Sequence, residues 1–168
     1  HPLGRWPFHF HKMEDASRGS LLEGLVATEC GTHAFGAHMS HGVTWQDCIA
    51  HDVQEAPFWW DTGQEVPAGE DDPPTNDNRY ERCVASFVKM GDPDNQHHAF
   101  LMGAGAGNVC RGCVASEVDG GSGETSGFLW TTRSQGNWTF EDTVAHHCEN
   151  GIRMWNNGST GFTQRRFI

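Results

Sequence analysis

The sequence predicts an all-β protein that folds as a right-handed parallel β-helix of about five coils. Two observations lead to this prediction. A short motif recurs along the chain, and a second run of apolar and aromatic residues follows each copy. Glycine and asparagine close the repeats, and the apolar spacing of amphipathic helices is essentially absent. Short strands separated by such turns are typical of a solenoid of stacked parallel strands.

The recurring motif has a bulky or apolar residue, two mostly polar residues, then Cys, Thr or Leu, then Val or Ile, and finally Ala. Its five copies are 22–27, 45–50, 80–85, 110–115 and 140–145. The second run follows at 34–38, 57–61, 99–103, 127–131 and 151–155. Because coils of a β-helix stack about 4.8 Å apart, equivalent residues are expected directly above one another.

The composition favours one folded domain covering residues 1–168. The chain has 168 residues, of which 36% are hydrophobic, with 7 Trp and 10 Phe. This is enough for a core, and too aromatic for a disordered chain. Asp and Glu number 22 against 11 Lys and Arg, so a net charge of −11 disfavours a nucleic-acid or anionic-membrane partner. No stretch approaches the roughly 20 apolar residues of a membrane span.

Uneven spacing of the repeats predicts loops inserted at one corner of the coil. The largest insertion, residues 62–78, is acidic and rich in proline, and we expect a solvated loop. The chain opens inside a second-run segment at Phe8 and stops at the beginning of a further coil, at Ile168. No capping segment is visible, so we expect a piece of a longer β-helix.

Strand alternation assigns the residues of the second run to two faces. If the column that begins with Phe8 and Phe35 points inward, two neighbouring columns point outward. One contains His9, Trp59 and Arg153, and the other contains His11, His38 and Asp61. This assignment also predicts an exposed apolar strip suited to sugar rings or to a protein partner. The residues of that strip are Trp59, Leu101, Leu129 and Trp155.

His11, His38 and Asp61 are the candidate catalytic and metal-binding residues. They would lie on three consecutive coils, with their side chains converging on one patch. Two imidazoles and a carboxylate are a ligand set for a divalent transition metal, which would keep positions open for water or substrate. Without a metal, the same groups could act as general acid and base. The alternative is an outward polar ladder that bonds only to its neighbours and to water.

The cysteines admit two interpretations. Cys48, Cys83 and Cys113 share one register on successive coils, where the spacing would permit a disulfide. An inward column of thiols is the arrangement we expect. Cys110 and Cys113 form a Cys-x-x-Cys pair, but the second pair of a zinc ribbon is not present in the sequence.

Four segments carry a further signal: Pro7–His11, Gly31–His38, Gly42–His51 and Phe58–Gly63. They resemble the parallel β-helix region of the cell-migration-inducing and transmembrane cell-surface hyaluronidases. That family carries a similar Pro-x-His-Phe-His run, a Val-His-Gly-type run, and an aromatic pair followed by an acidic residue and Gly. The matching positions here are His9, His11, His38 and Asp61, and the resemblance covers about residues 5–63. In this chain Met-Ser-His follows His38 in place of Gly. The resemblance implies an extracellular or cell-surface protein that acts on or binds a polysaccharide.

We therefore expect a secreted or surface carbohydrate-active protein that acts on or binds a polysaccharide, with Trp59, His9 and Arg153 contacting the sugar. If it is an enzyme, it would be a polysaccharide-degrading hydrolase or lyase. A lyase that pairs a carboxylate with Lys12 or Arg153 is less favoured, because no cluster of Lys and Arg would neutralise a uronate. The alternative is a non-catalytic solenoid for adhesion or assembly. In either case the expected partners are a polysaccharide and the remainder of the same solenoid or neighbouring subunits.

Overall fold

The computed structural model describes residues 6–60, 74–89, 91, 97–119, 125–130, 135–154 and 158–168. Within these ranges the side chains of residues 60, 135 and 158–162 are not described. Most of the insertion predicted at 62–78 lies outside the described residues, as does Asp61. No helix in the described ranges is long and apolar enough to cross a bilayer.

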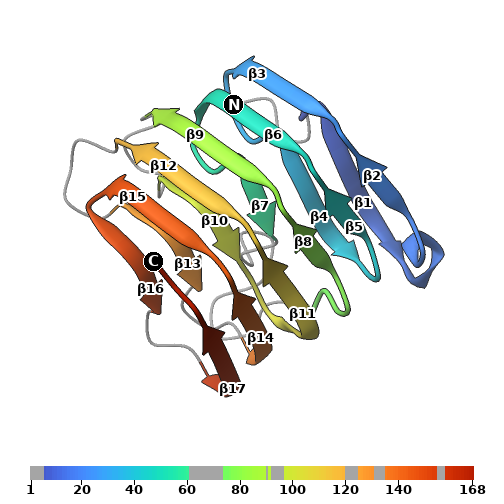
Figure 1. Ribbon diagram of the computed structural model, residues 1–168. Coiled ribbons are helices and arrows are strands. Elements are labelled where there is room, and N and C mark those ends of the chain that lie inside the picture. Colours follow the sequence, from blue (N-terminus) through green and yellow to red (C-terminus); the bar gives the residue numbers. More distant parts are fainter. Residues whose placement is uncertain are drawn as a thin grey trace.

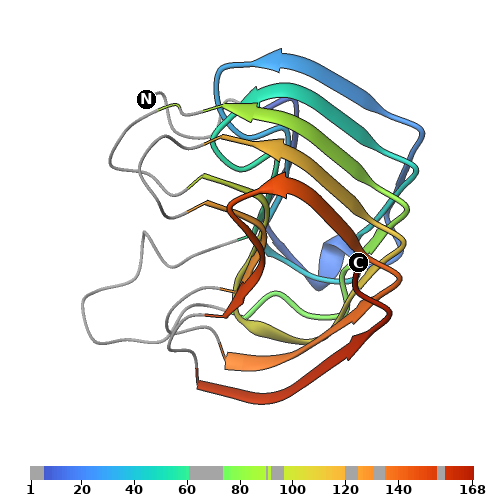
Figure 2. The same cartoon turned by 60° about the vertical axis from the view of Figure 1, so that its left-hand side comes forward.

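The described strands form three parallel sheets that wrap around one core (Figures 1 and 2). Sheet A consists of β1 (Phe8–Glu14), β4 (Phe35–Ser40), β7 (Phe58–Trp60), β10 (His98–Met102), β13 (Ser126–Trp130) and β16 (Asn150–Met154). Sheet B consists of β2 (Leu21–Glu23), β5 (Thr44–Gln46), β8 (Arg79–Glu81), β11 (Gly105–Arg111), β14 (Gln135–Glu141) and β17 (Gly158–Arg165). Sheet C consists of β3 (Val26–Cys30), β6 (Ile49–Gln54), β9 (Val84–Lys89), β12 (Val114–Val118) and β15 (Val144–Cys148). A short 3-10 turn, η1 (Asp15–Ser17), follows β1.

Each coil takes one strand from sheets A, B and C in turn. The order begins with β1, β2 and β3 and is completed five times before β16 and β17 start a sixth coil. Successive coils pair in parallel, without the hairpins of an antiparallel sheet. The predicted parallel β-helix of about five coils is confirmed.

The recurring motif spans two strands, where the sequence suggested a single run. Its third residue has a left-handed backbone, which turns the chain from sheet B into sheet C. The residues at this turn are Gly24, Asp47, Arg82, Gly112 and Asp142. Glycine adopts this conformation without strain. Asp47 and Arg82 are the turn residues of the second and third coils. The guanidinium of Arg82 donates to both carboxylate oxygens of Asp47, at 2.7 and 2.8 Å, and so links these two turns, which lack glycine.

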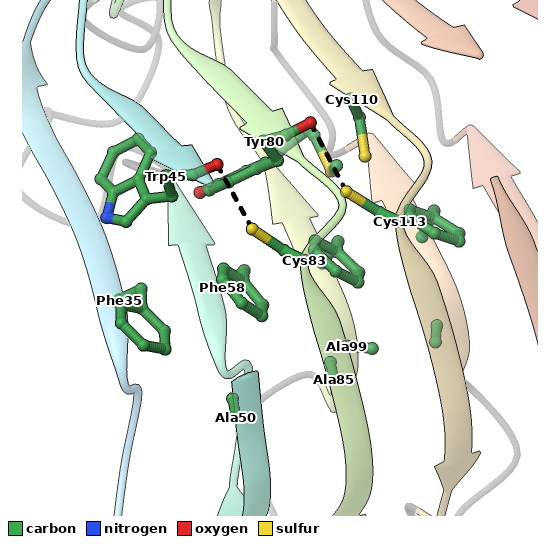
Figure 3. Packing of buried hydrophobic residues seen from close by; sticks show 14 of the residues in the cluster. Phe35, Trp45, Ala50, Phe58, Tyr80, Cys83, Ala85, Ala99, Cys110 and Cys113 are labelled. Atoms are coloured by element: carbon green, nitrogen blue, oxygen red, sulfur yellow. Dashed lines mark hydrogen bonds between the residues drawn. The ribbon is translucent and has the colours of Figure 1, made fainter. Parts of the chain in front are cut away.

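A stack of phenyl rings forms the centre of the core. Phe35, Phe58, Phe100 and Phe128 stand in register on β4, β7, β10 and β13, with ring centroids 4.6 to 5.0 Å apart. Small residues of sheet C, including Ala50 and Ala85, face the same interior (Figure 3). The rings are large and the facing alanines small, so the two layers complement each other in size. The inward column predicted from Phe8 and Phe35 is confirmed.

The cysteines of the repeat lie inside the core as free thiols, as expected. Cys48, Cys83 and Cys113 are fully buried, and all six cysteines of the chain are unpaired. Each of these three thiols donates to a carbonyl of the preceding coil; Figure 3 shows the bonds from Cys83 to Trp45 (3.3 Å) and from Cys113 to Tyr80 (3.5 Å). The column therefore supplies hydrogen bonds between coils, and the disulfide alternative is not realised.

Buried asparagines hold the corner between sheets A and B. The side chain of Asn78 accepts from the backbone of Val43 at 2.7 Å and donates to the carbonyl of Ser40 at 2.9 Å. Asn108 occupies the equivalent position one coil later, accepting from the backbone of Asn78 and donating to Thr75. These bonds satisfy backbone groups that the turn leaves without strand partners.

Candidate functional site

The candidate site lies on the outer face of sheet A, over its first strands. In the register of β1 and β4, His9 pairs with Gly36 and His11 pairs with His38. In the register of β4 and β7, Gly36 pairs with Trp59. For the described residues, the predicted outward columns are thus correctly aligned, and no one-residue slip turns His9, His11 or His38 inward.

The two imidazoles of the predicted site stack on each other. The ring centroids of His11 and His38 are 4.8 Å apart, and their planes differ by 17°. His11 is exposed, whereas His38 is only 5% exposed. A ligand that approaches this face therefore meets His11 first, with His38 directly beside it on the next coil.

His9 is the third imidazole of this cluster. Its ring centroid is 5.2 Å from that of His11 and 6.5 Å from that of His38. The pKa of His9 is lowered to about 4, mainly by burial and also by charge repulsion from the neighbouring His11 and His38. His9 is therefore neutral at pH 7, and one of its ring nitrogens can accept a proton.

The predicted metal set can be only partly placed. His11 and His38 provide two nitrogen donors on adjacent coils, which fits a divalent transition metal. The carboxylate of the set, Asp61, lies outside the described residues. Across the described ranges, no three His, Cys, Asp or Glu side chains come together as a metal-binding group. The fit to a metal therefore depends on Asp61.

The prediction of an exposed apolar strip is wrong for those residues of the strip that the structure describes. Trp59 is 6% exposed, and Leu101 and Leu129 are similarly buried in a second small cluster with Ala56. Trp6 packs against this cluster, with its ring centroid 4.7 Å from that of Trp59. Strand alternation assigned these side chains correctly to the outer face, but it does not reveal which other residues cover that face. Trp155, the last residue of the strip, lies outside the described residues.

Burial changes what the predicted substrate contacts can do. The ring of Trp59 stacks on that of His38, with centroids 6.2 Å apart and planes 4° apart. Trp59 therefore packs against the histidine cluster and does not present an exposed ring face to a sugar. Trp6 is only half-buried and lies 4.0 Å from His9, so it is the indole nearest to solvent in this group. Arg153 shares the column of His9, but on β16, at the opposite end of sheet A. Arg153 therefore does not lie near the cluster of His9, His11 and His38.

Sequence reasoning missed two polar residues at the edge of this cluster, His33 and Glu55. His33 lies between the indoles, 4.9 Å from Trp6 and 5.3 Å from Trp59. Its Nε2 is 3.5 Å from Oε2 of Glu55. The sequence contains a pattern that could have predicted this placement: His33 comes two residues before Phe35, and Trp6 comes two residues before Phe8. Trp6 and His33 thus begin their coils at equivalent positions.

Comparison of the chain with protein-family models, with curated proteins and with solved structures gave no match.

Proposed function

We propose that this chain is a secreted or cell-surface carbohydrate-active β-helix segment that acts on or binds a polysaccharide. The outer face of sheet A over β1 and β4 is its contact surface. The stacked pair of His11 and His38, with neutral His9 beside it, carries this proposal. Imidazoles are the groups best suited to exchange protons near pH 7. The resemblance of residues 5–63 to cell-surface hyaluronidases supports an extracellular polysaccharide as the ligand.

In this proposal the three histidines have different roles. His11 is exposed and would contact the glycosidic linkage directly as proton donor. His9 is neutral at pH 7 and would act only as a weak general base toward water or the sugar, because its lowered pKa disfavours the protonated ring. His38 lies deeper, and Trp59 and His11 hold its ring on both sides. Hydrolysis and elimination both require one proton to be donated and one removed, so both remain within this scheme.

A divalent metal is a second use of the same residues. His11 and His38 would hold it with Asp61, and the metal would supply Lewis-acid assistance or an activated water. Elemental analysis of protein purified without an affinity tag tests this directly. The prediction is about one equivalent of metal in the wild type and none in a His11→Ala/His38→Ala variant. Equal trace amounts in both preparations would reject the metal.

Binding and turnover assays on a panel of neutral and acidic polysaccharides test the proposal as a whole. The His11→Ala/His38→Ala variant should lose binding or turnover of the polysaccharide that the wild type recognises. A matched control replaces two exposed histidines of sheet C, His51 and His146, and should keep it. Loss in both variants, or in neither, would contradict a site on sheet A.

A non-catalytic solenoid for adhesion or assembly is the second candidate, and one observation favours it. On the outer face of sheet C, two β-branched residues that pair on adjacent coils are exposed, Val26 at 61% and Ile49 at 39%. Phe87 is exposed on the same sheet. Exposed apolar side chains that gather on one face are typical of interaction sites. An Ile49→Lys/Phe87→Lys variant that loses binding while the sheet A variant keeps it would favour this function.

A further inference from the structure

The indole of Trp6 lies over Gly36, on the outer face of sheet A. Gly36 stands between His9 and Trp59 in the outward column of β1, β4 and β7, and it brings no side chain to that position. A Cβ added to Gly36 would lie 2.6 Å from Cζ3 and 2.7 Å from Cε3 of Trp6. Any side chain at position 36 would therefore displace the indole. Trp6, from the segment before β1, fills the place that such a side chain would take.

Three further rings hold the indole in its orientation. Its centroid is 4.0 Å from that of His9, 4.7 Å from that of Trp59 and 4.9 Å from that of His33. Trp59 and His33 meet it edge-on, with planes at 61° and 87° to its own, which is a favoured geometry for aromatic pairs. Trp6 is nevertheless only half-buried. Because these contacts and Gly36 occupy the side of the ring that faces the sheet, its exposed part is turned away from the sheet.

The surroundings of this indole carry little positive charge. The pKa of His33 is lowered to about 4, mainly by burial, and that of His9 is lowered in the same way. Both imidazoles are therefore neutral at pH 7. Among the described residues of β1, β4 and β7, Lys12 is the one Lys or Arg, and the chain as a whole has a net charge of −11. A ligand with many carboxylates or sulfates would meet repulsion on this protein.

We propose that Trp6 is the sugar-stacking residue of the histidine site and that the site takes a neutral polysaccharide. The C–H groups on the face of a sugar ring pack on an aromatic ring, while the hydroxyl groups at its edge bond to polar neighbours such as imidazoles. Contacts lead from Trp6 to His9 and from His9 to His11. A sugar on the indole would thus have its adjoining linkage beside the proposed proton donor. This inference rests on the proposed function and assigns to Trp6 the role that the burial of Trp59 prevents.

The position of the indole on Gly36 can be tested without a ligand. The backbone at Gly36 is not left-handed, so alanine adds no backbone strain there. Gly36→Ala should increase the unfolding equilibrium constant in urea, because the new methyl group strikes the ring of Trp6. In a Trp6→Ala background the same substitution should have a much smaller effect, since the ring is absent. Equal effects in the two backgrounds would overturn this placement.

Calorimetric titration tests the ligand class and the role of Trp6 together. The probes are hexasaccharides of glucose, xylose and mannose, with hexasaccharides of galacturonic and glucuronic acid as acidic counterparts. The wild type should bind at least one neutral probe and neither acidic one. Trp6→Ala should weaken that binding about tenfold, whereas Trp6→Phe, which keeps an aromatic ring, should retain most of it. The matched control, Phe87→Ala, removes an exposed aromatic ring of sheet C and should leave binding unchanged.

The outcomes separate this inference from the proposed function. Neutral binding that survives Trp6→Ala but is lost in His11→Ala/His38→Ala would overturn the role of Trp6 and leave the proposed function standing. Binding of an acidic hexasaccharide alone would overturn the neutral ligand class only. Binding of no probe would overturn both.

A second measurement serves if Trp6→Ala does not fold. The wild type is labelled with 5-fluorotryptophan, and the ¹⁹F signal of Trp6 is assigned by its loss in Trp6→Phe. This signal should shift and reach saturation as the bound neutral hexasaccharide is added. A signal that stays unchanged while calorimetry shows binding would overturn the stacking role.

Discussion

His11 of β1 and His38 of β4 lie face to face, with ring centroids 4.8 Å apart and planes within 17° of parallel. The stack follows from the parallel register of the two strands, which pairs these residues directly. Solenoid stacking thus brings side chains that are 27 positions apart in the sequence into contact. The same geometry governs the phenyl core, the thiol column and the asparagine corner, so each can be tested by a single substitution.

The phenyl stack should contribute strongly to stability at its centre. Phe58 is fully buried between Phe35 and Phe100, with centroid distances of 5.0 and 4.6 Å. We predict that Phe58→Ala lowers the free energy of unfolding by about 3–5 kcal/mol, because it removes a large apolar side chain and leaves a cavity. Urea unfolding followed by circular dichroism measures this loss. Phe8→Ala, at the half-buried end of the stack, should cost clearly less; an equal loss at both positions would contradict the packing.

The buried thiols should be unreactive in the folded protein. Burial raises the pKa of the Cys113 thiol well above its ordinary value, and only the thiolate reacts. We predict that a thiol reagent modifies the half-buried Cys30 and Cys148 first, and modifies Cys48, Cys83 and Cys113 only after unfolding. Mass spectrometry of the labelled peptides gives the order. Early labelling of Cys83, or a stability that drops on addition of reductant, would speak against a column of free thiols.

The sequence allowed the solenoid, its inward phenyl column and its thiol column to be predicted, because each recurs at equivalent positions of the repeat. The bend between sheets B and C was missed because Asp47 and Arg82 take left-handed conformations there. In a sequence, such a conformation is clearly indicated only by glycine. The burial of Trp59 was missed because Trp6, which covers it, lies before the first strand. The contact of His33 with Glu55 was missed because both residues lie at a corner between strands. There, strand alternation does not predict which way a side chain points.

Acid should destabilise the protein partly through His98. This residue is buried, and its Nδ1 is 2.7 Å from Oγ of Ser126. The pKa of His98 is lowered to about 3, mainly by burial and also by charge repulsion from Arg153 and His97. The unfolded histidine takes up a proton below about pH 6.5. The unfolded state therefore binds more protons than the folded state, so stability falls as pH decreases from about 6.5 toward 3.

A His98→Gln variant isolates this effect, because glutamine does not titrate. Between pH 6.5 and 5, the unfolding equilibrium constant of the wild type should rise about sixteenfold more than that of the variant. The exposed His51→Gln should behave like the wild type. Equal pH slopes for the wild type and His98→Gln would show that His98 is not held neutral in the folded state.

The most direct test of the central claim is an NMR titration of ¹⁵N-histidine-labelled protein with oligosaccharides prepared from the panel of polysaccharides. The ring signals of His9, His11 and His38 should shift together and reach saturation, while those of His51 and His146 on sheet C should stay unchanged. Shifts confined to sheet C, or none with any oligosaccharide of the panel, would contradict a carbohydrate site on the outer face of sheet A.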